Sequence, residues 1–373
     1  MVARTSSRAT LESVAARAAV SRQTVSNVLN APHLVREATR QRVYDAIADL
    51  RYQPHAGARA LRTRRSRVMA LRLEPLHDGI NGAVLDRFLH AFTEEAHAAG
   101  YRIELFTGGD DASEIEQYEH MLDSADVDGF VLTSTHQGDQ RTRWLIDHDV
   151  PFVTFGRPWG APPDLDHPWV DVDGAAGTRA AVSHLRSAGH EHIGFLGWPK
   201  GSGVGDDRRS GWLAALLDEG VSRRRLKALD VEVEDGVNQG AAAMRSLLFM
   251  KAPPTAVVCA SDSLALGALA GSTAVGATLA IVGFDDTPVA SAVGLSSLTQ
   301  PLRQVAQQAF ALLVYRLEQP AGGPPPDPHR LLAPELVVRG NNSIPPRLIP
   351  LVNDSSPTAG PPSAARATKR STA

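Results

Sequence analysis

The chain contains a single cysteine, Cys259, among 373 residues. One cysteine excludes an intrachain disulfide framework and a zinc site built on cysteines. No apolar run approaches the roughly 20 residues that a membrane-spanning helix needs. The arginines near the N-terminus are not followed by the apolar stretch of a secretory signal. We therefore expect a cytoplasmic protein, with two or three domains at this length.

Motifs of the common enzyme classes are missing as well. The sequence has no phosphate-binding P-loop, no GxSxG, no HExxH and no metal-ligand spacing. The glycine-rich stretch 201–206 superficially resembles a dinucleotide loop, but it lacks the GxGxxG spacing and the acidic residue that should follow. We interpret it as a flexible ligand loop. The sequence thus predicts a protein that is not an enzyme, with no cofactor and no metal.

Lysine is absent from the first 67 residues, which carry 13 arginines against 4 acidic residues. This segment has a net charge of +9 in a chain whose total is −3, so the remainder is acidic. A basic segment attached to an acidic body is typical of nucleic-acid binding. A solvated basic arm would have the same charge, so the helical pattern has to decide between the two.

Two short amphipathic helices are predicted between Thr10 and Asn30. Their inner faces are formed by apolar residues at helical spacing, namely Leu11, Val14, Ala15 and Ala18, then Val25, Val28 and Leu29. Thr10 and Ser21 are suitable N-caps. The polar positions of the second helix face outward, as a recognition helix requires; they are Arg22, Gln23, Ser26 and Asn27. An ordinary helical hairpin on a globular surface is the alternative.

A third amphipathic helix within 35–52 and a basic segment starting at Pro54 follow. Over residues 10–65, residue types and spacing resemble the DNA-binding headpiece of the LacI/GalR family. Two positions depart from the family pattern: Ala19 stands where glycine is usual, and Asn27 where arginine is more frequent. A positive φ at Ala19 would cost about 1 kcal/mol relative to glycine.

The resemblance implies a homodimer bound to a nearly palindromic operator. Base contacts would come from the outward-facing residues of the second helix, while the arginines of the third would contact phosphates. In the hinge, Ala58 and Leu61 would enter the minor groove, with the leucine wedged between base pairs. A plain basic linker would explain the charges of this segment but not the position of Leu61.

Beyond Val68, short apolar runs alternate with helical stretches. The predicted strands are 68–73, 101–106, 129–133, 151–155, 192–197, 256–261 and 279–284. The predicted helices are 82–99, 113–123, 139–147, 175–188, 208–220, 238–249 and 263–275. This alternation favours parallel sheets covered by helices on both faces. It is similar to the sugar-sensing core of the same family, which implies an α/β core of two Rossmann-like subdomains of the periplasmic-binding-protein type.

The same resemblance implies a domain organisation. It places a helix-turn-helix domain at 1–53, a hinge at 54–67, a ligand-binding core at 68–342 and a disordered tail at 343–373. The N-subdomain would comprise 68–172 and 302–328, and the C-subdomain 174–300 and 330–342. The chain would cross between them near Asp173, Gln300 and His329. Because the tail has no leucine heptad, a dimer is favoured over a tetramer.

The effector is expected in the cleft between the subdomains, beyond the carboxyl ends of the strands. The candidate effector-binding residues are Arg208, Asp285, Ser261, Gln300, Trp198, Leu302 and Arg157. Trp159 would offer an aromatic face to a sugar, although a core or interface position is nearly as plausible for either tryptophan. Arg72 lies in an apolar strand and must either line the pocket or pair with Glu74.

The sequence therefore predicts a DNA-binding transcriptional regulator, most simply a repressor, that a small molecule controls. A sugar is the expected effector, and a purine or another metabolite is the alternative. A transport-type sugar-binding protein and an enzyme on the same scaffold are the competing classes. The first lacks its signal sequence here, and the second its catalytic residues.

Overall fold

The structure is a computed structural model that describes residues 9–52, 65–74, 80, 82–160, 162, 166–318 and 326–340. The expectations for Ala58, Leu61, most of the hinge and the C-terminal tail fall outside these residues. Within them, no helix combines the length and the apolar character that crossing a membrane requires.

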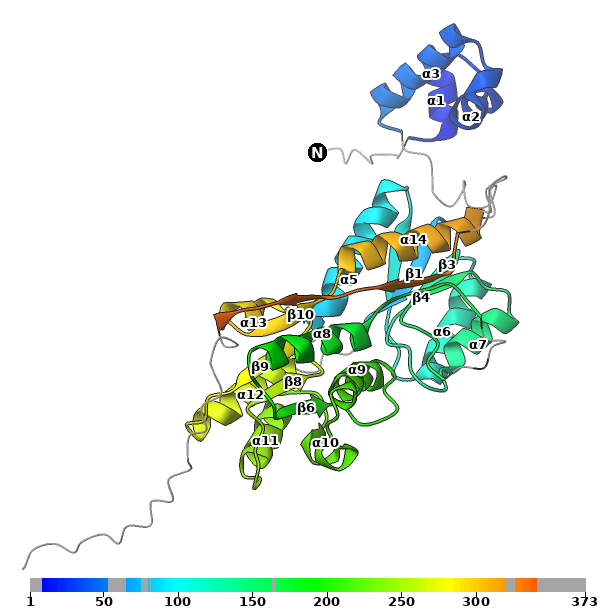
Figure 1. The fold of residues 1–373 in the computed structure, drawn as a ribbon. Helices are drawn as coiled ribbons and strands as arrows, with labels where there is room; N and C mark the ends of the chain where they lie inside the picture. Colours follow the sequence, from blue (N-terminus) through cyan, green and yellow to red (C-terminus); the bar gives the residue numbers. More distant parts are fainter. Residues whose placement is uncertain are drawn as a thin grey trace, which may run out of the picture.

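The headpiece is a bundle of short helices around a small apolar core (Figure 1). Its elements are α1 (Leu11–Ala18), α2 (Arg22–Asn30), a 3-10 turn (Pro32–Leu34) and α3 (Glu37–Leu50). Val14, Val25 and Val43, one from each α-helix, are fully buried where the helices meet. The N-caps hold both helices of the motif: the Thr10 hydroxyl accepts from the Ser13 amide, and the Ser21 hydroxyl from the Thr24 amide.

The N-subdomain is built on a parallel sheet with strand order β11-β5-β4-β3-β1-β2. Its strands are β1 (Val68–Arg72), β2 (Arg102–Phe106), β3 (Gly129–Leu132), β4 (Phe152–Phe155), β5 (Trp169–Val172) and β11 (His329–Leu332). Alternate residues face opposite sides of the sheet. Met69 and Val131 belong to the apolar cluster under α5 (Gly82–Ala98) and α14 (Leu302–Glu318). Ala70 and Phe130 belong to the cluster under α6 (Asp111–Asp123) and α7 (Gln140–Asp147).

The C-subdomain repeats this plan with strand order β12-β10-β9-β8-β6-β7. Its strands are β6 (Ile193–Gly197), β7 (Asp230–Glu232), β8 (Ala256–Cys259), β9 (Ala280–Phe284), β10 (Ser296–Thr299) and β12 (Glu335–Val337). All neighbours are parallel except β12, which is antiparallel to β10. The helices are α8 (Gly174–Ser187), α9 (Val204–Asp218), α10 (Arg223–Leu229), α11 (Val237–Leu248), α12 (Asp262–Ala274) and α13 (Pro288–Ala292). Cys259 is buried in the single apolar cluster of this subdomain.

The chain passes three times between the two sheets. The first two passages lie at Asp173, between β5 and α8, and at Gln300, between β10 and α14. The third differs from our expectation, because β11 pairs with β5 in the N-subdomain sheet, with His329 opposite Trp169. The crossing therefore falls between β11 and β12, which run as one extended segment from one subdomain to the other (Figure 1). The His329 ring stacks on the Trp169 ring at 5.0 Å, which favours keeping His329 in the N-subdomain.

Candidate functional site

The candidate recognition surface of the headpiece is the polar side of α2. Arg22 and Gln23 are exposed, while Ser26 and Asn27 are partly buried. The Gln23 side-chain amide donates to the Asn27 side-chain oxygen at 3.0 Å, which fixes one amide against the other. The Arg22 guanidinium lies 3.4 Å from the Glu12 carboxylate of α1, with both side chains exposed. Such a pair is weak in water and can be exchanged for a contact with DNA.

Arg208 forms the centre of the cleft on the side of the C-subdomain. It lies in α9, is buried, and donates through Nη1 to the carbonyl of Ala260. Its guanidinium stands over the Phe284 ring at 3.6 Å, and its Nη2 is 3.6 Å from Asp285 Oδ1. Burial lowers its pKa, while Asp285 and other nearby carboxylates raise it. Its Nε is buried without a hydrogen-bond partner among the described residues.

Asp285 follows β9 in a strained conformation, with φ at +110°. Gln300 Nε2 donates to Asp285 Oδ1 at 2.7 Å. Burial raises the pKa of Asp285 to about 7, against the opposing effect of Arg208. Strain at a buried, partner-rich carboxylate is typical of binding sites. The structure therefore brings Arg208, Asp285 and Gln300 together, although they come from three separate parts of the sequence.

Ser261 and Leu302 have different structural roles. Ser261 is fully buried and caps α12, accepting from the Leu264 amide, and its hydroxyl donates to Asp235 at 2.5 Å. Leu302 is buried at the start of α14, beside the crossing. The geometry thus gives Ser261 a capping role and places Asp235 beside it.

Arg157 connects the two subdomains across the cleft. Its Nε donates to Asp171 of its own subdomain at 2.7 Å, and its Nη2 lies 2.8 Å from Asp207 at the start of α9. Trp159 stacks on the Arg157 guanidinium at 4.4 Å. A Cβ added to Gly203 would lie only 2.4 Å from the Trp159 ring, so the glycine-rich loop touches the N-subdomain here. Burial raises the pKa of Asp171, and Arg157 opposes that rise.

Trp198 belongs to the C-subdomain, whereas Trp159 lies in the N-subdomain. Trp198 is half-buried, with its ring 5.3 Å from the Arg208 guanidinium. The indole N–H groups of both tryptophans are buried and have no hydrogen-bond partner among the described residues. This region therefore combines two aromatic rings with several buried donors that have no partner among the described residues.

Comparison with known proteins agrees with this arrangement. Residues 10–55 match the model of bacterial regulatory proteins of the lacI family, and residues 182–341 match a periplasmic binding protein-like domain. The chain is 35% identical to the HTH-type transcriptional regulator CelR of Thermobifida fusca over 348 residues, which cover 89% of this chain and 98% of the relative. The chain belongs to the LacI family.

Other relatives and solved structures extend the comparison. The HTH-type transcriptional repressor PurR of Erwinia tasmaniensis is 29% identical over 83% of this chain and 90% of its own. A solved complex of the transcriptional regulator CelR with cellobiose superimposes with a TM-score of 0.66 at 31% identity, covering 89% of this chain and 99% of that one. A LacI-family regulatory protein from Chloroflexus aggregans gives 0.68 at 35% identity, over 74% and 98%. These relatives are transcriptional regulators rather than enzymes, and this LacI-family chain is a DNA-binding regulator with an α/β effector core.

Sequence reasoning missed three carboxylates of this LacI-family cleft. Asp171, Asp207 and Asp235 all act on Arg208 electrostatically, and the first two flank Arg157. Asp207 directly precedes Arg208, so its position in the chain was a usable signal. Asp171 lies within β5 and Asp235 lies just beyond β7, two short strands that the apolar pattern did not reveal.

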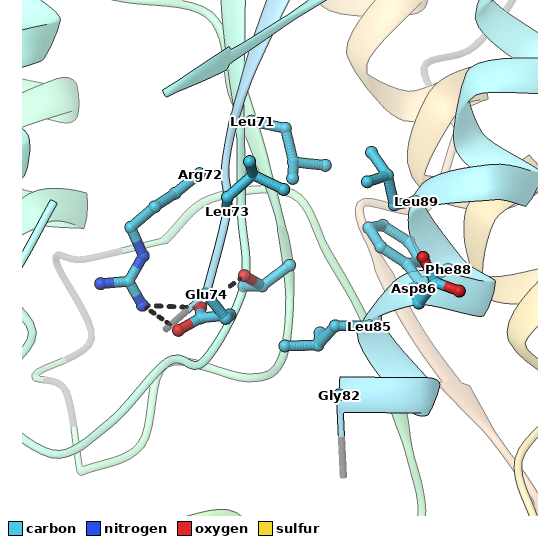
Figure 2. A pocket seen from close by; sticks show the side chains of 10 residues that line it. Leu71, Arg72, Leu73, Glu74, Gly82, Leu85, Asp86, Phe88 and Leu89 are labelled. Atoms are coloured by element: carbon cyan, nitrogen blue, oxygen red, sulfur yellow. Dashed lines mark hydrogen bonds and ion pairs between the residues drawn. The ribbon is translucent and has the colours of Figure 1, made fainter. Parts of the chain in front are cut away.

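A second hollow lies at the carboxyl end of β1 (Figure 2). It measures about 130 Å³, with an apolar wall that includes Leu85 and Phe88 of α5. Arg72 binds both oxygens of Glu74 at 2.6 Å, and Thr133 donates to Glu74 at 3.0 Å. Burial raises the pKa of Glu74, but Arg72, Ser134 and Thr133 together lower it more, and the net shift is downward. Of the two roles considered for Arg72, pairing with Glu74 is observed, and the pair also lines this hollow.

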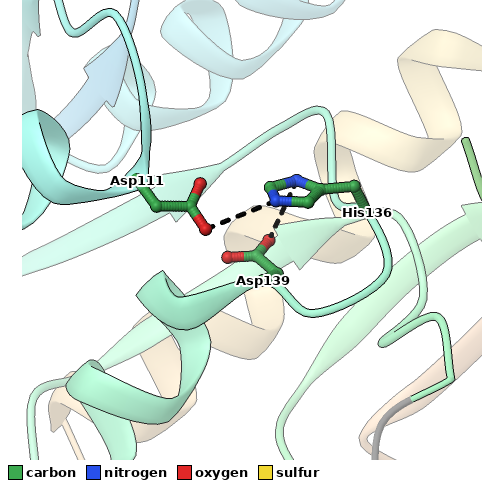
Figure 3. A group of neighbouring side chains, drawn as sticks. All are labelled: Asp111, His136 and Asp139. Carbon is green, nitrogen blue, oxygen red and sulfur yellow. Dashed lines mark ion pairs between the residues drawn. The ribbon is translucent and has the colours of Figure 1, made fainter.

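Asp111, His136 and Asp139 lie close enough together to resemble a metal site (Figure 3). However, Arg141 already neutralises this group, with its Nη2 2.7 Å from Asp139 and its Nε 3.5 Å from Asp111. Asp139 also caps α7, and Asp111 accepts from the Gln140 amide at 2.9 Å. The two carboxylates thus have structural partners, and we assign them no metal.

Proposed function

We propose that this protein is a repressor whose operator binding is controlled by a saccharide in the cleft. The observation that carries the proposal is the grouping of Arg208, Asp285 and Gln300, with Trp198 beside Arg208 and Trp159 stacked on Arg157. A sugar hydroxyl both donates and accepts hydrogen bonds, so it suits a site that has carboxylates beside arginine and indole donors. The apolar face of a pyranose packs well on an aromatic ring.

The charge of the cleft supports a neutral ligand. Four carboxylates act on Arg208, whereas Arg157 is the other arginine described at the cleft; the carboxylates are Asp171, Asp207, Asp235 and Asp285. An excess of buried negative charge disfavours phosphates and acidic sugars. Relatives leave the ligand class open, because one is solved with cellobiose while others are PurR repressors. The hydroxyl-matching groups of this cleft lead us to favour the saccharide.

A thermal-shift measurement on the full chain tests the ligand. Cellobiose, glucose, xylose disaccharides, hypoxanthine and guanine would be added separately. A ligand at about a hundredfold excess over its Kd stabilises the folded state by about 2.7 kcal/mol. We expect a saccharide to raise the melting temperature, and Arg208→Ala and Asp285→Asn to abolish that rise. If a purine raises the melting temperature and no sugar does, the effector is a purine and the saccharide proposal is wrong.

For DNA, we propose that Arg22, Gln23, Ser26 and Asn27 read base edges and that Leu61, next to Ala58, wedges into the minor groove of the operator. Arginine suits guanine, and glutamine and asparagine suit adenine. Two copies of the chain would occupy the two halves of a nearly palindromic site, since symmetric dimers match symmetric sequences. An effector controls such binding only if it binds one arrangement of the subdomains better than the other.

The wedge is tested by Leu61→Ala in the full chain. Unstacking a base step is repaid by contacts that a bent duplex allows, so operator affinity should fall while the melting temperature stays unchanged. Arg59→Ala is a control that removes a charge from the same segment without touching the wedge, and it should weaken all duplexes alike. Equal operator affinity of Leu61→Ala and the wild-type protein would remove the wedge from the account.

A further inference from the structure

The last two residues of the hinge, Ser66 and Arg67, are tied to the N-subdomain by one carboxylate. Asp128 Oδ1 accepts from the Ser66 amide at 2.6 Å and from the Ser66 hydroxyl at 2.8 Å. Asp128 Oδ2 accepts from the Arg67 amide at 2.9 Å. Hydrogen bonds to an ionised acceptor are roughly twice as strong as neutral ones. Asp128 therefore holds the chain where it enters the core.

Two arginines reinforce this attachment at other elements. Arg65 Nη2 donates to the Leu317 carbonyl near the end of α14 at 2.6 Å. Arg67 donates to the Ala99 carbonyl at 3.2 Å, and its guanidinium lies 5.3 Å from the centre of the Tyr101 ring. Residues 65–67 thus contact α14, the residue that follows α5, and the loop before β3. This segment must therefore move together with the N-subdomain.

Asp128 is also connected through β3 to the hollow at the carboxyl end of β1. It precedes β3, and its own amide donates to the Val68 carbonyl at 2.8 Å. β3 is four residues long, roughly 13 Å at the usual rise. At its other end Thr133 donates to Glu74 in the hollow of Figure 2. One buried strand therefore separates the carboxylate that holds the hinge from this hollow of the N-subdomain.

The length of chain leaves little freedom between this attachment and the hinge leucine. Leu61 and Ser66 are five residues apart, so their Cα atoms are at most about 17 Å from each other. In a dimer, the distance between the two copies of Ser66 thus limits where the two copies of Leu61 can meet. A change in how the two N-subdomains face each other would move both copies of Ser66 and therefore both copies of Leu61.

We propose that Asp128 is a positioning residue for operator recognition, which passes the orientation of the N-subdomain to the hinge. The inference rests on the proposed role of the hinge in DNA binding. Asp128 contacts no DNA; it sets the place from which the hinge reaches the duplex. Loss of its charge should therefore weaken sequence-specific binding, which needs the hinge, more than non-specific binding through the basic headpiece.

The test compares Asp128→Asn with Asp126→Asn in the full chain. Asp126 is an exposed carboxylate two residues earlier in the same loop, so its substitution removes the same charge without the attachment. Each protein is titrated with a duplex that the wild-type protein has selected from a random library, and with a random duplex. The readout is the ratio of the two affinities, which does not depend on the fraction of protein that is folded.

We expect Asp128→Asn to lower this ratio about tenfold, the effect of losing roughly one charge-assisted hydrogen bond. Ser66→Ala, which removes one of the three bonds, should give a smaller fall, and Asp126→Asn none. If Asp128→Asn shows the same affinity ratio as Asp126→Asn, the inference is overturned, whether or not the melting temperature of Asp128→Asn falls. Failure of the proposed function gives another result, because the wild-type protein would then select no duplex at all.

Discussion

At the scale of single residues, the cleft contains a buried arginine and a buried carboxylate, both in surroundings that are unfavourable for a charged side chain. Arg208 is buried, with one nitrogen that finds no partner in the part of the chain that the structure describes, and Asp285 is buried in a positive-φ conformation. Both features cost folding free energy, and a ligand that supplies hydrogen bonds relieves part of that cost. The family resemblance predicted Arg208, Asp285 and Gln300 as site residues, but the sequence contained no sign that the first two are buried or that Gln300 donates to Asp285.

Asp285 predicts a specific dependence of stability on pH. Burial raises its pKa from 3.8 to about 7, so the folded state holds the proton more tightly than the unfolded state. Its stabilising contribution is complete below about pH 4 and is lost as the pH rises through 7. Between these values the unfolding free energy of the wild-type protein should fall relative to Asp285→Asn, by up to about 1.4 kcal/mol per pH unit. Denaturant titrations that give parallel pH profiles for the two proteins would contradict this.

At the scale of elements, the headpiece was predictable because its signals are local. Caps, apolar spacing and the turn all lie within 21 consecutive residues, 10–30, and the structure agrees with them. In the core, the apolar central strands were predicted, whereas short strands with polar residues, such as β7, β10 and β11, were not. Helix α14 was overlooked although Leu302, Val305 and Ala309 show helical spacing on its buried side.

The turn of the helix-turn-helix gives a prediction at this scale. Ala19 adopts φ 51° as the C-cap of α1, a left-handed conformation that glycine adopts more easily. Ala19→Gly should therefore stabilise the α1–α2 unit by about 1 kcal/mol. Ala16→Gly, at an exposed position inside α1, should destabilise it by about the same amount. Hydrogen exchange of the α1–α2 amides in the full chain measures both effects: exchange should slow in Ala19→Gly and accelerate in Ala16→Gly. If exchange changes equally and in the same direction in both variants, the assigned role of Ala19 is refuted.

At the scale of the whole molecule, the two subdomains are joined by three crossings and by contacts across the cleft. The family resemblance suggested all three crossings. It placed the third near His329, whereas in the structure this crossing lies further along the chain, between β11 and β12. The contacts were not predictable, because Arg157 and Asp207 are 50 residues apart and meet only when both sheets are in place. The same holds for Trp159 and Gly203. These contacts couple the closing of the cleft to the position of the N-subdomain.

The Arg157–Asp207 pair should therefore stabilise the closed arrangement of the cleft. Asp207→Asn removes the charge that faces Arg157, and we expect the population of open molecules to rise about tenfold, equivalent to about 1.4 kcal/mol. Spin labels at Glu116→Cys and Ala242→Cys, exposed positions on α6 and α11, would report the distance between subdomains. Asp206→Asn is the control, since Asp206 pairs with Arg209 inside the C-subdomain. Identical distance distributions for the two variants would show that the pair does not hold the cleft.

The central claim is that a basic headpiece reads DNA sequence through the exposed side of α2. It is tested most directly by repeated selection of random duplexes with the full chain, in parallel with a variant carrying Arg22→Ala and Gln23→Ala. We predict that the wild-type protein enriches one nearly palindromic sequence and that the variant enriches none while keeping its fold and its non-specific binding. Absence of any enriched sequence with the wild-type protein, both without ligand and with each sugar and purine tested, would contradict the account.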